Sequence, residues 1–340
     1  MKRVGLTMLL LIPMVIPELI IGLTPLSPAA AFVIAGNMPT MIAWMFAPRY
    51  ALATIPLAAL MNLLAVLAFG DPAATTLLVL GVAVLVGLSA LKGFHPVATF
   101  LALQPAIILI SGYASVSFGP TTPGVVGQAV ICAGVVAIGG VWALLMGVLL
   151  LRDAPVGAPD PVPVPMVAFY TVALLVLLTP TAFIAATWFE GTTAGWVLVS
   201  ILIVTRPSYD ESRTMIAERA LGTLFGGILA AALAVTIDAG EVLVMLGTFA
   251  SVAAAVAYLL HVRYAYFAAF LTASIVLLHA ERADVLQTDV ERVVYTVVGL
   301  MLVAVAVALA ERVFGRYTPA AGAMTDDMTV PDHAAQAAAG

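Results

Sequence analysis

The chain has 340 residues, of which 63% are apolar and 9% are charged, and its mean hydropathy is +1.15. About a quarter of the residues in a soluble globular domain are charged, so this composition excludes a soluble domain and indicates a polytopic membrane protein. The net charge of −5 comes with dispersed basic residues rather than a basic stripe, which argues against nucleic-acid binding.

Apolar runs of roughly 20 residues recur between short polar breaks, and a helix needs about that length to cross a bilayer. No continuous stretch alternates apolar and polar residues as a membrane β-barrel requires. We therefore predict an all-α protein with twelve transmembrane helices. The predicted spans cover residues 4–23, 28–47, 50–70, 74–91, 95–112, 125–151, 166–189, 193–205, 214–237, 241–260, 262–279 and 290–314.

The basic residues fall mainly on one side of this predicted topology. Eleven Lys and Arg residues lie in segments on the side of the N-terminus, and only Arg282 and Arg292 lie on the other side. Because Lys and Arg are retained in cytoplasmic loops, both termini are predicted to be cytoplasmic.

A Pro-rich stretch, DAPVGAPDPVPVP, separates two halves of six predicted spans each. Alternating prolines favour an extended connector over a helix. A shift of 170 residues places Arg49 on Arg219, which suggests an internal repeat. Since six is an even number, both halves have the same orientation, as in transporters built from parallel repeats. The predicted units are a first repeat at 1–152, the connector at 153–165, a second repeat at 166–316 and a disordered cytoplasmic tail at 317–340.

The densest cluster of charge is the stretch IVTRPSYDESRTMIAERALGTLFGG at 203–227. Ser208 and Glu211 have the spacing of a capping box, so a helix is predicted to begin near Tyr209 and to continue into the ninth span. Small residues follow Arg219 on one face of this helix. The set is Gly222, Thr223, Gly226 and Ala230, with Gly227 adjacent. Two interpretations are open: a substrate groove beneath Arg219, or a glycine packing face with the arginines serving only as membrane anchors.

The second and eighth predicted spans are irregular. Gly36-Asn37-Met38-Pro39-Thr40 interrupts the second, and the eighth has about fourteen apolar residues before Thr205-Arg206-Pro207. Short or broken spans at matching positions of two repeats indicate a transport site, because unpaired backbone at membrane depth has to face protein or a cavity. The alternative is a simple proline kink and a span lengthened by Trp196.

Glu18 is the one acidic residue clearly inside a predicted span. A charged carboxylate in the middle of a bilayer is costly, so Glu18 is predicted to face the bundle interior or water. Proton coupling and interfacial anchoring are both open for this residue.

The sequence carries no signature of catalysis or metal binding. It contains no GxxxxGK[ST] loop, no HExxH and no GxSxG, and its single cysteine, Cys132, lies in an apolar run. We therefore predict no enzymatic activity, no cofactor and no metal site.

The run from Trp196 to Arg206-Pro207, with Arg213 and Arg219-Ala-Leu-Gly222-Thr223-Leu-Phe-Gly226-Gly227 after it, resembles a known signature. That signature, RP…R…R-x-x-GT-x-x-G, is the one of the fusaric-acid-resistance and aromatic acid exporter superfamily. The similarity continues downstream in Tyr264, Tyr266, Phe270, Thr272, Arg292 and Gly299. It covers residues 166–315 well and the first half only as a degenerate copy. The chain resembles compact members without the large cytoplasmic domain.

The resemblance implies an exporter of small organic, chiefly aromatic, acids or related toxic compounds in the inner membrane, often paired with a periplasmic membrane-fusion adaptor. We predict export driven by the proton-motive force. Two alternatives are a passive organic-anion channel and a membrane scaffold subunit for the adaptor. Whether the chain forms a homodimer is left open.

Each candidate residue has a predicted role in this export. Arg206, Arg213 and Arg219 are predicted to gather the carboxylate, and Arg49 is their counterpart in the first half. Asn37, Thr223 and Thr272 are predicted to line the path, Trp196, Tyr264 and Tyr266 to support an aromatic ring, and Glu18 to couple the proton. Gly222, Gly226 and Gly227 are predicted to pack helices.

Overall fold

The computed structural model describes residue 13 and residues 16–150, 160–237, 239–259, 262–278 and 285–314. Over these residues the protein is all-helical and has no strand, apart from one isolated bridge between Phe118 and Thr121. The α-helices are α2 (Phe32–Phe46), α3 (Pro48–Ala68), α4 (Pro72–Ser89), α5 (His95–Ser111), α6 (Val125–Leu150), α7 (Val164–Trp188), α8 (Gly195–Val204), α9 (Tyr209–Thr236), α10 (Gly240–Leu259), α11 (Tyr264–Leu278) and α12 (Val285–Phe314).

Seven helical stretches in this part of the chain are long and apolar enough to cross a membrane. The prediction of an all-α polytopic membrane protein is therefore confirmed. Helices α2 to α12 lie at the positions of predicted spans two to twelve, although α5, α8 and α11 are apolar helices of only 10–17 residues. The count of twelve spans stays a prediction, because most of the first span lies outside the described residues. The predicted tail and most of the predicted connector also lie outside them.

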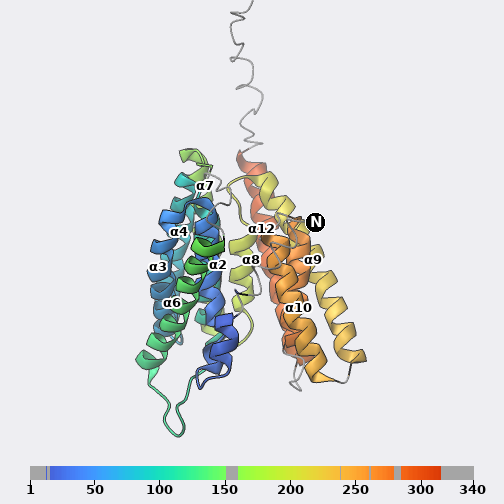
Figure 1. The fold of residues 1–340 in the computed structure, drawn as a ribbon. Coiled ribbons are helices and arrows are strands. Elements are labelled where there is room, and N and C mark those ends of the chain that lie inside the picture. Colours follow the sequence, from blue (N-terminus) through green and yellow to red (C-terminus); the bar gives the residue numbers. More distant parts are fainter. Residues whose placement is uncertain are drawn as a thin grey trace, which may run out of the picture.

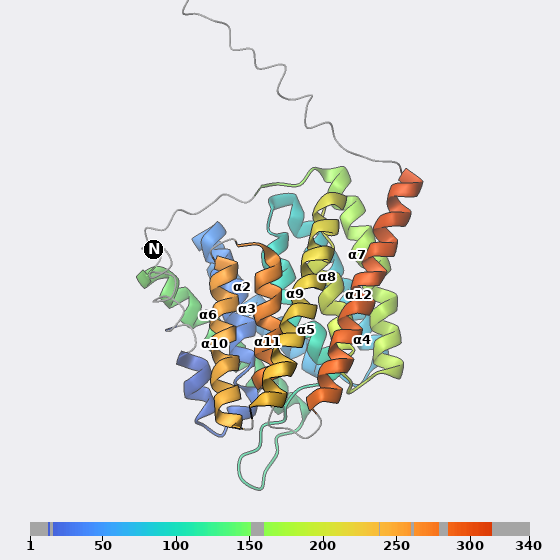
Figure 2. The same cartoon turned by 90° about the vertical axis from the view of Figure 1, so that its right-hand side faces the viewer.

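The helices form two groups with α8 between them (Figure 1). Helices α2, α3, α4, α6 and α7 lie on one side of α8, and α9, α10 and α12 lie on the other. Figure 2 shows α9, α10, α11 and α12 side by side on one face. Helix α8 contacts both α5 and α12 and so joins the two groups.

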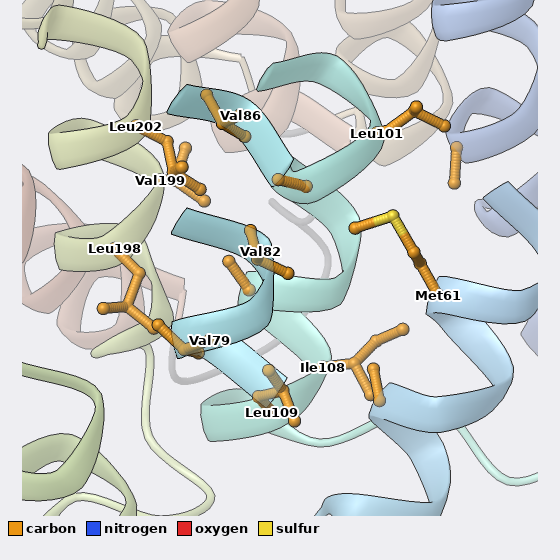
Figure 3. Close-up of a cluster of buried hydrophobic side chains, with 14 of the residues drawn as sticks. Met61, Val79, Val82, Val86, Leu101, Ile108, Leu109, Leu198, Val199 and Leu202 are labelled. Carbon is orange, nitrogen blue, oxygen red and sulfur yellow. The ribbon is translucent and has the colours of Figure 1, made fainter. Parts of the chain in front are cut away.

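The apolar core of the first group extends to α8. Buried side chains from α3, α4, α5 and α8 meet there, and Met61, Val82, Leu109 and Leu198 are examples (Figure 3). In lipid these contacts are stabilised by close packing rather than by exclusion of water. These core contacts therefore fix the position of α8, because its ten residues are too few to span a bilayer.

The two halves of the chain pack their helices in the same pairs. Helix α2 packs on α6 as α8 packs on α12, and α3 packs on α5 as α9 packs on α11. A Cβ added to Gly139 of α6 would lie 2.1 Å from the carbonyl oxygen of Val33, and one added to Gly299 of α12 would lie 2.8 Å from that of Val197. Both crossings thus depend on a glycine at the contact. These matching pairs are what a repeat predicts, and the arrangement as two repeats of six spans stays a prediction.

Candidate functional site

The start of α9 is built by a serine cap after the break at Pro207. The Ser208 hydroxyl oxygen accepts a hydrogen bond from the backbone N–H of Glu211 at 3.3 Å, and the helix begins at Tyr209 as predicted. The Ser212 hydroxyl oxygen accepts from the backbone N–H of Arg206 at 2.9 Å. The connection between α8 and α9 is therefore held by side chains of α9 itself, which fixes the position of Arg206.

An open cavity of about 490 Å³ lies at this connection, beside the start of α5. Its lining residues are His95, Arg206, Asp210, Glu211, Thr214 and Met215. The cavity thus brings one guanidinium together with two carboxylates, and these carboxylates stabilise the N-terminus of α9. Arg206 alone does not make this cavity selective for anions.

Arg219 lies deeper in the bundle than Arg206 and is 3% exposed. Its Nη1 donates a hydrogen bond to the hydroxyl oxygen of Tyr264 on α11 at 2.7 Å. Its Nε has no hydrogen-bond partner among the described residues, and no carboxylate of those residues forms an ion pair with it. A buried charge is costly unless it is paired, so an anion at this guanidinium would be strongly stabilised.

The glycines of the predicted stripe lie against the backbone of α11. A Cβ added to Gly222 would lie 2.4 Å from the carbonyl oxygen of Ala265, and one added to Gly226 would lie 2.1 Å from that of Ala269. Helix α11 therefore occupies the space beneath Arg219, which corrects the alternative of an open substrate groove there. A Cβ added to Gly227 would find its nearest neighbour 3.8 Å away, at Thr272 Cγ2, so Gly227 makes no close approach of this kind.

The structure does not bring the three arginines of the charged stretch together. The Arg213 side chain is 53% exposed and pairs with Glu311 of α12, away from Arg219. Arg206 lies at the cavity, and Arg219 faces α11. The first-half counterpart, Arg49, is exposed and lies over the ring of Tyr50, with the guanidinium carbon 4.9 Å from the ring centroid.

The other predicted residues are spread over the bundle. Thr223 and Thr272 are buried on α9 and α11, which pack on each other. Asn37 is buried on α2, whose main partners are α3, α5 and α6. Tyr266 is 55% exposed, and Glu18 is half-buried near the start of the described chain.

Arg292 of α12 was not among the predicted site residues. It is 7% exposed, and its guanidinium carbon lies 4.1 Å from the centroid of the Trp196 ring at the start of α8. The Trp196 ring therefore forms a cation–π contact with Arg292 in this structure. The sequence carries two signals for Arg292: it is one of only two basic residues on its side of the predicted topology, and it belongs to the downstream part of the family resemblance.

Comparison with known proteins agrees with the resemblance inferred from the charged stretch. The model of the fusaric acid resistance protein-like family matches residues 181–307, which include Trp196, Arg206, Arg219 and Arg292. No curated protein and no solved structure is similar enough to match. The fold is that of a multi-pass membrane protein, and residues 181–307 are similar to the fusaric acid resistance protein-like family, a similarity that suggests membrane efflux or transport of small compounds.

Proposed function

We propose that the protein is a membrane transporter that exports small organic acids, and that Arg219 and Tyr264 bind the substrate carboxylate. The observation that carries this proposal is the buried guanidinium of Arg219, whose charge no carboxylate of the described residues neutralises. The match to a family named for resistance to an acid supports it independently.

The geometry of Arg219 suits a carboxylate in particular. Tyr264 occupies Nη1, and the opposite edge of the guanidinium carries Nε and Nη2. Two parallel N–H groups on one edge bind the two oxygens of a carboxylate side-on. Tyr264 would hold the guanidinium plane in place for this contact, because its hydroxyl fixes one end of the fork.

The proposed route begins at the end of the bundle that carries the α8–α9 connection, which the basic residues predict to be cytoplasmic. Arg206 at the cavity would meet the acid before Arg219 does, and Arg213 on the exposed face of α9 stays a prediction for the route. Thr223 and Thr272 are buried where α9 and α11 pack closely, and their place on the path stays a prediction. Asn37, Arg49, Trp196 and Tyr266 stay predictions for the same path.

Proton coupling is proposed to involve Glu18. It is half-buried in the helical segment 16–22, and a carboxyl group that is partly removed from water favours proton exchange over permanent charge. The inner membrane, cytoplasmic termini, a parallel pair of six-span repeats and a periplasmic adaptor belong to the same proposal. The rivals are a passive anion channel and a scaffold subunit.

Uptake of radiolabelled benzoate or fusaric acid into inside-out membrane vesicles tests the carboxylate site. Arg219→Gln is expected to lower the ratio kcat/KM by about 10- to 100-fold, because a hydrogen-bonded charge pair contributes about 1.5–3 kcal/mol. Arg263→Gln is the matched control, since Arg263 is exposed and pairs with Glu218 at 3.1 Å. Wild-type uptake by the Arg219 variant, at equal protein levels, would overturn the proposed site.

A second measurement separates the exporter from its rivals. With purified protein in liposomes, a pH gradient is expected to drive benzoate accumulation, and Glu18→Gln is expected to abolish accumulation while downhill flux continues. Flux that follows voltage alone and ignores the pH gradient would instead establish the channel. Complete absence of flux in the wild-type protein would favour the scaffold.

A further inference from the structure

The cavity at the α8–α9 connection carries charges of both signs that do not pair with one another. Arg206 contributes a guanidinium, and Asp210 and Glu211 contribute carboxylates. None of these three charged groups takes part in an ion pair with another of the described residues. Opposite charges that line one cavity without pairing can both be satisfied by a ligand that bears both signs.

The positions of these charges follow from the capped turn and not from an attraction between them. The Ser212 hydroxyl oxygen accepts from the backbone N–H of Arg206 at 2.9 Å, so the backbone of Arg206 is tied to α9 while its side chain is left out of this contact. Asp210 and Glu211 lie in the first turn of α9, where a negative charge is favourable. The three residues are therefore placed around the cavity before any ligand arrives.

One face of α9 forms a wall of the cavity. Thr214 lies four residues after Asp210, and Met215 lies four residues after Glu211, so these side chains stand in two adjacent rows. The Thr214 hydroxyl donates to the backbone carbonyl oxygen of Asp210 at 2.9 Å, which leaves the Asp210 carboxylate open to a ligand. Met215 is half-buried and adds an adaptable apolar surface beside the carboxylates, suited to a hydrocarbon segment.

A buried hydroxyl without a hydrogen bond lies behind another wall. His95 of α5 lines the cavity, and its ring meets that of Tyr170 of α7 edge-on, with 6.2 Å between the ring centroids. Tyr170 is 1% exposed, and although Thr99 lies beside it, neither hydroxyl oxygen forms a hydrogen bond among the described residues. The charges of Arg206 and Glu211 both act on the Tyr170 hydroxyl, so it lies near them. Because buried polar groups are nearly always hydrogen-bonded, this one indicates a polar ligand or the water that accompanies it.

We propose that this cavity binds aminocarboxylate zwitterions, with the ligand carboxylate at Arg206 and the ligand ammonium group at Asp210 and Glu211. The proposal rests on the proposed export of organic acids and adds to it a substrate class, the acids that also carry an ammonium group. The hydrocarbon between the two ligand charges lies against Met215. A simple anion gains the contact with Arg206 but approaches two carboxylates, so it binds less tightly than the zwitterion.

Methyl NMR of the full chain in nanodiscs, labelled at the methionine methyl groups, reads binding at the cavity itself. The chain has 14 methionines, and the Met215→Leu variant assigns the signal of Met215. The ligands are 6-aminohexanoate, hexanoate and pentylamine, which share a hydrocarbon chain and carry both charges, the negative charge or the positive charge. We expect 6-aminohexanoate to shift the Met215 signal with a Kd at least about threefold lower than either single-charge ligand, because it gains one more charged contact.

Neutral variants of the cavity separate the two charges of the ligand. Glu211→Gln and Asp210→Asn are each expected to raise the Kd of 6-aminohexanoate about threefold to tenfold and to leave or lower that of hexanoate. Glutamine at position 211 keeps the capping box, so α9 retains its start. Arg206→Gln is expected to weaken both ligands. Glu218→Gln is the matched control on the same helix, since Glu218 pairs with Arg263 and does not line the cavity.

The outcomes distinguish this site from the proposed function. A Met215 signal that ignores 6-aminohexanoate, or that gives it the same Kd as hexanoate, overturns the zwitterion site while the dependence of uptake on Arg219 stands. Binding of 6-aminohexanoate that depends on Glu211, in a protein that transports neither this compound nor benzoate, supports the site and rejects the export. If the cavity variants do not fold, the ranking of the three ligands on the wild-type protein decides: any order without the zwitterion as the tightest overturns the site.

Discussion

Arg213 and Arg219 lie six residues apart on α9, yet their surroundings differ in every respect. The Arg213 side chain is 53% exposed and pairs with Glu311, whereas Arg219 is 3% exposed and bonds to the Tyr264 hydroxyl. At 3.6 residues per turn, six residues turn the helix by about 240°, so one arginine faces α12 and the other faces α11. The difference teaches that burial without a neutralising carboxylate, rather than positive charge itself, marks the candidate anion site on this helix.

The largest expected effect comes from the contact that buries Arg219. Gly226→Ala places a methyl group against the Ala269 carbonyl oxygen, 2.1 Å away, and so forces α9 and α11 apart. Such overpacking costs about 1–3 kcal/mol, and the moved α11 carries Tyr264 away from Arg219. We expect a lower melting temperature in detergent and loss of benzoate uptake. Gly227→Ala is the matched control, because its nearest contact would be at 3.8 Å, and equal melting of the two variants would contradict the packing argument.

A smaller effect is expected when only the partner of Arg219 is changed. Tyr264→Phe keeps the ring and removes the hydroxyl that accepts from Nη1. Loss of one hydrogen bond contributes about 0.5–1.5 kcal/mol, so the ratio kcat/KM for benzoate is expected to fall about threefold to tenfold. Tyr50→Phe serves as control on the exposed α3 terminus. If uptake by Tyr264→Phe matched the wild type, Tyr264 would have no part in orienting Arg219.

The positions of the helices could be predicted from the sequence, and their contacts could not. Apolar runs set the spans, and the serine cap set the start of α9 at Tyr209. Hydropathy does not distinguish the side of α9 that faces protein from the side that faces lipid, because the residues on both sides of a membrane helix are apolar. The pairing of Arg213 with Glu311, 98 residues later, and the stacking of Arg292 on Trp196 therefore needed the fold.

The smallest effect is expected at the exposed end of α9. Arg213→Gln breaks the ion pair with Glu311, but exposed pairs contribute about 0.2–1 kcal/mol because water screens them. We therefore expect benzoate uptake within about twofold of the wild type. Exchanging the charges in the double variant Arg213→Glu, Glu311→Arg keeps the pair and reverses its direction, so uptake should again be unchanged. A tenfold loss in both variants would show that Arg213 itself gathers the acid, as its place in the charged stretch predicts, and would make exposure a poor guide to function on α9.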